Sequence, residues 1–179
     1  MKILNILCVT GAFFAYGCTT ETIVQLGSDG RPLPKIYRIS PESKNKVQFR
    51  MLDSINALRL ATGHPPLTYN AALNAAAATH ARDMAVQNRP WHFGSDGSSP
   101  LIRVRRSGYQ GVFLGETISE TFETELETLS AWMGRDDTSG IILDPRATNL
   151  GFAWFQETNG KIWWALLTGT TFMDKLNQG

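Results

Sequence analysis

Trp91–Pro100 reads WHFGSDGSSP and Gly115–Ile118 reads GETI, and these two stretches say most about the fold of the chain. The first places His92 in a loop rich in Gly, Ser and Asp, and the second places Glu116 after a short apolar run. A histidine and a glutamate that fold onto one cleft can hold a metal ion, move a proton or bind a polar ligand. Both side chains are therefore the first candidates for a functional site.

Two long helices are predicted before this loop. Ser40 and Pro41 are typical of an N-cap and a first helical residue, and Gly63 is typical of the end of the helix that they begin. A second helix is expected from about Asn70 to Gln87. Helical spacing predicts one inner stripe on each helix. The stripes are Val47, Met51, Ile55 and Leu58 in the first helix, and Leu73, Ala77, His80 and Met84 in the second.

Shorter elements follow the loop and predict a mixed α+β domain of packed layers. The inner face of the predicted helix 121–133 should carry Phe122, Leu126, Leu129 and Met133. Trp163 and Trp164 are neighbours in a predicted strand, so they should point to opposite faces and pack in the core. The predicted elements are a helix at Pro100–Ser107 closed by Gly108, a strand at Val112–Leu114 that delivers Glu116 from its end, a helix at Thr121–Met133, and strands at Leu150–Gln156 and Lys161–Leu167.

The two opening stretches resemble the CAP superfamily of cysteine-rich secretory, antigen 5 and pathogenesis-related 1 proteins. In bacterial extracellular members they run H-x-x-x-D-G-S-S-P and G-E-N-[IL]. The resemblance covers about residues 45–170. It implies an α+β fold, a three-layer α-β-α sandwich with a small antiparallel sheet between helices. Weaker parts of the pattern are LDSINALR at Leu52–Arg59, PLTYN at Pro66–Asn70, ILDP at Ile142–Pro145 and LGFA at Leu150–Ala153.

The resemblance also implies a site, of which this sequence keeps half. Larger family members place two histidines and two glutamates around a cleft that can bind a divalent metal. His92 matches the first histidine and Glu116 the first glutamate, whereas the second histidine position holds Thr138 and the second glutamate position holds Arg135. Two ligands bind zinc weakly, and an arginine repels a cation. The expected cleft is therefore lined by His92, Glu116 and Thr138. No catalytic residue, metal ligand or cofactor is assigned to it. In the alternative, Asp96, Asp136 or Asp137 would supply the missing ligands for a divalent metal.

Several residues have simpler structural interpretations. His92 either ties its loop to the strand through a hydrogen bond to Glu116, or binds a ligand in the same cleft. His80 lies on the inner stripe of its helix and is expected to be a core histidine. The basic run Arg103–Arg106 is expected to be a solvated helix face. The GSDG of the loop occurs also at Gly27–Gly30, which is typical of turns and not of a calcium site.

The N-terminus is predicted to direct export. Residues 1–17 read as a signal peptide, with a short apolar stretch that ends in Ala15-Tyr16-Gly17 before Cys18. Cys18 is expected to carry a lipid, and ordinary signal-peptidase cleavage at the same bond is the alternative. Residues 18–43 are predicted to form a tether and residues 44–174 the CAP-like domain. The only cysteines are Cys8 and Cys18, so the exported domain contains no disulfide.

Composition narrows the range of functions. Hydrophobic residues make up 42% and charged residues 18% of the chain, as in a globular domain. Without residues 1–17 the charges balance, so nucleic acid is not an expected partner. The hypothesis is an envelope lipoprotein, membrane-anchored (in the outer membrane if the cell is Gram-negative) or secreted, that binds a lipid, a wall component or a partner protein without catalysis. The alternative is a metal-assisted hydrolase of envelope polymers that uses His92 and Glu116.

Overall fold

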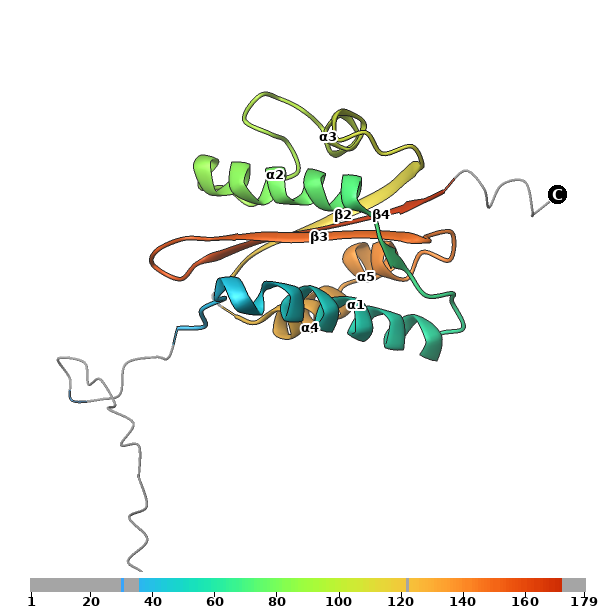
Figure 1. Ribbon diagram of the computed structural model, residues 1–179, viewed down its shortest axis with the longest axis horizontal. Coiled ribbons are helices and arrows are strands. Elements are labelled where there is room, and N and C mark those ends of the chain that lie inside the picture. Colours follow the sequence, from blue (N-terminus) through green and yellow to red (C-terminus); the bar gives the residue numbers. More distant parts are fainter. Residues whose placement is uncertain (1–29, 31–35, 122, 172–179) are drawn as a thin grey trace, which may run out of the picture. The chain divides into compact units, whose positions relative to one another are not determined.

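The computed structural model describes Gly30, residues 36–121 and residues 123–171. The predicted signal peptide, Cys18 and most of the predicted tether lie outside the described residues. Figure 1 shows helices on both sides of one sheet. The elements are a 3-10 turn at Pro41–Ser43, α1 (Lys44–Ala61), β1 (Thr68–Tyr69), α2 (Ala71–Gln87), α3 (Pro100–Arg106), β2 (Val112–Thr121), α4 (Glu125–Met133), α5 (Asp136–Ile142), β3 (Asn149–Gln156) and β4 (Ile162–Thr170).

The sheet has the strand order β1-β3-β4-β2. The hairpin of β3 and β4 forms its centre, and β2 pairs antiparallel with β4. The short β1, which the sequence did not predict, pairs in parallel with the first residues of β3. Among the described residues β2 is therefore an edge strand, and most of β3 has no strand beside it on its outer side.

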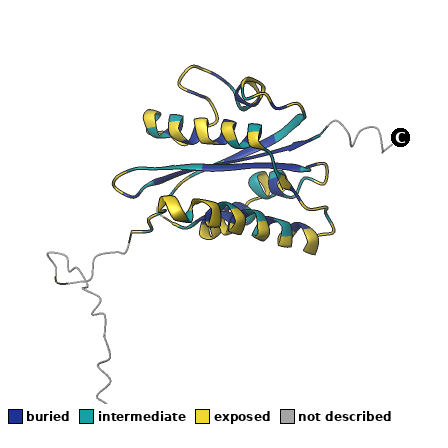
Figure 2. Ribbon diagram, viewed as in Figure 1, coloured by how far each residue is buried: buried dark blue, intermediate teal, exposed yellow. Residues whose placement is uncertain are grey.

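The three layers follow from the alternation of side chains along β3 and β4. Trp164 packs in the cluster under α1, α4 and α5, whereas Trp163 packs in the cluster under α2 and α3. Both indoles are fully buried, as predicted. Figure 2 shows buried residues along the strands and on the inward sides of the helices. The predicted three-layer α-β-α sandwich is confirmed.

The two long helices begin and pack largely as predicted. Asn70 caps α2, because its side chain accepts hydrogen bonds from the backbone N–H groups of Ala72 and Leu73. Gly151 of β3 lets α2 come close, since a Cβ there would lie 2.3 Å from the backbone carbon of Leu73. One residue of the predicted stripes was wrong: Leu58 is partly exposed, and Arg59 is buried instead.

The junction between β2 and α4 also differs from prediction. The helix expected from Thr121 begins at Glu125, because β2 continues to Thr121 and Thr124 forms a capping box with Glu127. Within it Leu129 is buried, but Leu126 is exposed; Phe122 lies outside the described residues. The helix α5 was not predicted.

The domain also begins before the predicted boundary at residue 44. Tyr37 and Ile39 pack against the core under α1. The Tyr37 hydroxyl donates to Glu125, and the Gln156 side chain bonds the backbone of Tyr37 and Ile39. Residues 36–43 are thus part of the domain, not of a tether. No helix among the described residues is long and apolar enough to cross a membrane.

Candidate functional site

Glu116 lies inside β2, not at the end of a strand as predicted. It pairs with Leu167 of β4, and β2 continues for another five residues. A register irregularity between Phe113 and Gly115 precedes it. Its carboxylate is buried against the α2–α3 side of the sheet, where the side chain is 1% exposed. A carboxylate this deep needs a charged or hydrogen-bonding partner.

That partner is Arg103 of α3. One of its terminal nitrogens lies 3.0 and 2.8 Å from the two oxygens of Glu116. The other donates to the carbonyls of His92 and Ser98, each at 2.9 Å. The prediction that Arg103–Arg106 forms a solvated face was wrong for this residue, whose side chain is only 5% exposed. Arg103 joins the strand, the helix and the His92 loop in one network.

Sequence reasoning did not find Arg103 because the run around it looks uniformly basic. One signal was available. Glu116 stands within an apolar strand, and a buried carboxylate requires a cation or several donors. The nearest upstream source of a cation was the run Arg103–Arg106.

His92 completes the network from the outside. Its Nδ1 lies 2.9 Å from Oε1 of Glu116, and its side chain is half exposed. Because a carboxylate only accepts, Nδ1 carries the proton of this hydrogen bond. The loop is closed by Asp96, which accepts from the backbone N–H of Ser98, and by Gly97 with φ +75°. The structure thus contains the predicted hydrogen bond between loop and strand.

His80 is buried, as expected of a core histidine. Its Nε2 lies 3.0 Å from the carbonyl of Trp91 and 3.7 Å from Glu116. Burial lowers the pKa of His80, against the raising effect of Glu116 and with a further lowering effect of Arg103. The ring is therefore neutral, with Nε2–H donating to Trp91, and its contact with Glu116 is not an ion pair. Its Nδ1 is buried without a partner among the described residues.

Lowering the pH is expected to destabilise the domain through His80. The pKa of His80 is lower in the folded domain than in the unfolded chain. As the pH falls below 6.5, the ordinary pKa of histidine, His80 therefore binds a proton in the unfolded chain before it does so in the folded domain. The His80 contribution is present above that pH and lost as the pH falls towards the folded pKa, with a limiting slope of about 1.4 kcal/mol per pH unit. Urea titrations at several pH values, compared with His80→Gln, measure it. An unchanged pH dependence in the variant would contradict the assignment.

A pocket of about 470 Å³ opens beside Glu116, at the edge of the sheet formed by β2. His92 and Glu116 line one side. The opposite wall is Trp132 of α4 with residues of α5, among them Thr138, so all three predicted cleft residues meet here. The Thr138 hydroxyl donates to the Trp132 carbonyl, which joins α5 to α4. On the rim, Arg135 pairs with Asp137 at 2.8 Å.

The residues present do not fit the metal site of the family. Both oxygens of Glu116 already accept from Arg103, whose positive charge also opposes a cation. Asp137 is paired with Arg135, and Asp96 with Arg106. No group of three or more His, Cys, Asp or Glu side chains suited to a metal occurs among residues 36–121 and 123–171. The donor set is that of a hydrogen-bonding pocket.

Comparisons with known proteins agree with this fold. The family model of the cysteine-rich secretory protein family, CAP, matches residues 52–167. The uncharacterised protein YkwD of Bacillus subtilis is 27% identical over 124 residues, which are 69% of this chain and 48% of that protein. The chain thus spans about half the length of this relative.

Two solved structures are similar. An outer surface protein of Borrelia burgdorferi has a TM-score of 0.65 at 17% identity, covering 76% of this chain and 99% of that one. An extracellular Bacillus anthracis protein with an SCP domain has a TM-score of 0.63 at 20% identity, covering 74% of this chain and 44% of that one. At these identities the likeness shows the fold alone.

Proposed function

Because the chain belongs to the CAP family of cysteine-rich secretory proteins, we propose that it is a non-enzymatic envelope protein that binds a polar component of the cell wall, a glycopeptide, in the pocket beside His92. The observation that carries this proposal is the double contact of Arg103 with Glu116. A carboxylate whose two oxygens both accept from a guanidinium is shielded and has little capacity left for a metal ion, so it is a poor metal ligand. The cleft then serves binding.

The groups that line the pocket favour a polar ligand over a lipid. The half-exposed ring of His92 and the Arg135–Asp137 pair border it, together with hydroxyl-bearing side chains of β2 and α5. A lipid tail would desolvate these groups without replacing their hydrogen bonds to water. A wall glycopeptide carries hydroxyls, amides and carboxylates that can replace them. The Trp132 indole, buried at the back of the pocket wall, donates its N–H to the hydroxyl of Ser119 and holds that hydroxyl in place.

Location at the cell envelope is the second part of the proposal. The two structural relatives are described as an outer surface and an extracellular protein, which supports export of this chain. We propose that Cys18 carries the lipid that anchors the domain to a membrane. Mass spectrometry of the membrane fraction would detect a diacylglyceryl adduct on Cys18, and an unmodified Cys18 N-terminus in the medium would instead indicate a secreted protein.

Ala131→Arg is expected to reduce binding of purified disaccharide-pentapeptide by about tenfold or more, measured by calorimetry. Ala131 is exposed on α4 and lines the pocket, so a long side chain fills the space without disturbing the core. Ser130→Arg, the exposed neighbour outside the pocket, is the matched control. Equal binding by both variants would refute the site. Hydrolysis of the glycopeptide that disappears in His92→Ala would refute the non-enzymatic assignment and favour the hydrolase.

A further inference from the structure

Within residues 36–121 and 123–171, strand β3 has an open edge on the face that Figure 1 presents to the viewer. Its neighbour β1 is two residues long and pairs only with Asn149 and Leu150. The remaining residues of β3 extend beyond it, between the start of α1 and the helix α2. Open edges present unpaired N–H and C=O groups, and proteins normally cover them.

At the first exposed position of this edge, Phe152, side-chain amides form hydrogen bonds with both the backbone N–H and the backbone C=O. The Phe152 N–H donates to Oδ1 of Asn74, and the Phe152 carbonyl accepts from Nε2 of Gln48, each at 3.3 Å. In an antiparallel ladder every second residue directs its N–H and C=O away from the neighbouring strand. Phe152 does so, and Trp154 therefore does so as well. Among the described residues, no hydrogen bond to these two groups of Trp154 is found.

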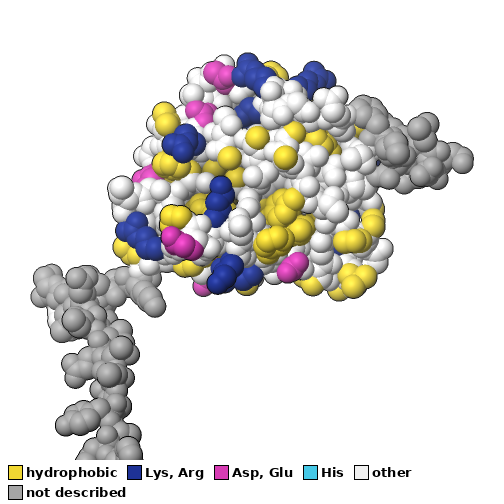
Figure 3. Space-filling model, in the orientation of Figure 1, with side chains coloured by type: hydrophobic (Ala, Val, Ile, Leu, Met, Phe, Trp, Pro, Cys, Tyr) yellow, Lys and Arg dark blue, Asp and Glu magenta, His cyan; other side chains and the backbone are white. Residues whose placement is uncertain are grey.

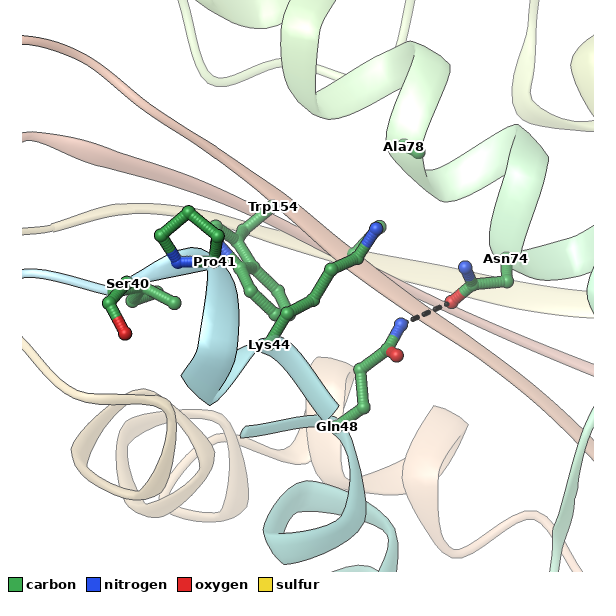
Figure 4. A pocket seen from close by; sticks show the side chains of 9 residues that line it. Ser40, Pro41, Lys44, Gln48, Asn74, Ala78 and Trp154 are labelled. Carbon is green, nitrogen blue, oxygen red and sulfur yellow. Dashed lines mark hydrogen bonds between the residues drawn. The ribbon is translucent and has the colours of Figure 1, made fainter. Parts of the chain in front are cut away.

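A pocket of about 270 Å³ lies at this position. Figure 4 shows Trp154 on one side with Pro41 and Lys44 of the first helical turns, and Gln48 hydrogen-bonded to Asn74 at the other end. Ala78, one helical turn beyond Asn74, borders it from α2. The pocket thus combines an apolar indole, an unpaired backbone N–H and C=O, and a lysine.

The charged side chain that lines this pocket, Lys44, is positive. Arg82, one turn beyond Ala78 on α2, lies over the ring of Phe155 at 4.9 Å. Neither makes an ion pair with an Asp or Glu of the described residues, although other basic side chains of this domain do. Figure 3, in the same orientation, shows several Lys and Arg side chains on this face.

We propose that this pocket binds an extended peptide segment that carries a carboxylate, contributed by another envelope protein. One residue of the segment adds to β3 by exchanging hydrogen bonds with the N–H and C=O of Trp154. Its carboxylate then meets the ammonium group of Lys44. Backbone hydrogen bonds supply the affinity in such strand addition and side-chain pockets supply the selectivity. The short gap between Pro41 and Gln48 limits the bound segment to a few residues.

The proposal does not depend on the proposed wall-binding function. The pocket at Trp154 and the pocket at His92 open at opposite edges of the sheet, beside β3 and β2. Variants at one edge should leave binding at the other unchanged. The two proposals can therefore fail separately.

The test uses an acetylated hexapeptide of alternating Val and Glu, titrated to about 1 mM into the ¹⁵N-labelled protein. The NMR chemical shift of the Trp154 backbone amide is expected to change as peptide is added and to reach a plateau. The Val-Lys hexapeptide should not change it, because Lys44 repels its charge. A Val-Glu peptide with methylated backbone nitrogens should also fail, because it cannot donate to the Trp154 carbonyl.

Lys44→Glu is expected to weaken binding of the Val-Glu peptide by about tenfold. Lys46→Glu is the matched control: Lys46 is exposed on the same helix, lies outside the pocket, and should change binding by less than about twofold. An unshifted Trp154 amide at saturating peptide overturns the proposal. The proposal is also overturned if the methylated or the Val-Lys peptide binds as tightly as the Val-Glu peptide, or if Lys44→Glu and Lys46→Glu weaken binding of the Val-Glu peptide equally.

Discussion

Arg103→Met is expected to lower the free energy of unfolding by about 3–5 kcal/mol, because it leaves the buried carboxylate of Glu116 without its cation. The substitution also removes the hydrogen bonds to the carbonyls of His92 and Ser98. Met keeps an unbranched apolar stem like that of arginine but lacks the guanidinium, so the effect combines the lost charge and hydrogen bonds with the space that the guanidinium leaves. Urea unfolding followed by tryptophan fluorescence measures it.

The double variant Arg103→Met/Glu116→Met provides the sharper comparison. Removing both members of a buried ion pair often restores much of the stability that one removal costs. We therefore expect the double variant to be more stable than Arg103→Met. Arg105→Met, on the same helix but exposed, should lie within about 0.5 kcal/mol of the wild type. A Glu116→Met change that adds to the loss would show that the pair is not coupled.

Arg59→Met is expected to cost a similar amount, about 3–5 kcal/mol, for a different reason. The Arg59 side chain is fully buried in α1 and donates to backbone carbonyls, with no carboxylate in direct contact. Without it the buried carbonyls of Ile142, at the end of α5, and of Ala147, in the loop that follows, lose this donor. The bonds reach Pro65 at 2.8 Å, Ile142 at 2.8 Å, Asp144 at 3.0 Å and Ala147 at 3.1 Å.

The position of these bonds gives Arg59 a role in the shape of the cleft. It holds the end of α5, which carries Thr138 and the opposite wall of the His92 pocket. Arg59→Met should therefore speed amide hydrogen exchange in residues 136–148 more than in α2. Lys46→Met, exposed on the same helix, is the control. A uniform increase across the domain would show that Arg59 contributes only to global stability.

The elements that sequence reasoning found are those whose pattern is local. Each long helix carries an inner stripe and a terminating signal, Gly63 after α1 and Arg89-Pro90 after α2, and Asn70 caps α2; each signal lies within a few residues of its helix. The β3–β4 hairpin was found from alternation and a turn. The two-residue strand β1 and the helix α5, seven residues long, were missed, because tertiary contacts and not local pattern stabilise such short elements.

The candidate cleft was found in outline through the resemblance to the family. His92, Glu116 and Thr138 line one pocket in the structure, although they lie far apart in the sequence. Motif matching worked here because each position was compared with a known pattern. It missed Arg103, because a run of basic residues does not show which arginine side chain is buried in the folded domain.

By itself, the amino-acid sequence determined the layers of this protein, since hydrophobic period and caps act along the chain over one or two turns. It also determined that half of the family's His and Glu positions are replaced, by Thr138 and Arg135. Only the tertiary structure decided the partner of Glu116. Coulomb and desolvation energies are set by distances in three dimensions, so the sequence alone does not say which cation reaches a buried carboxylate. A terminal nitrogen of Arg103 lies 2.8 Å from Oε2 of Glu116, and this contact fixes the hydrogen-bonded pair of His92 and Glu116 as one wall of the pocket.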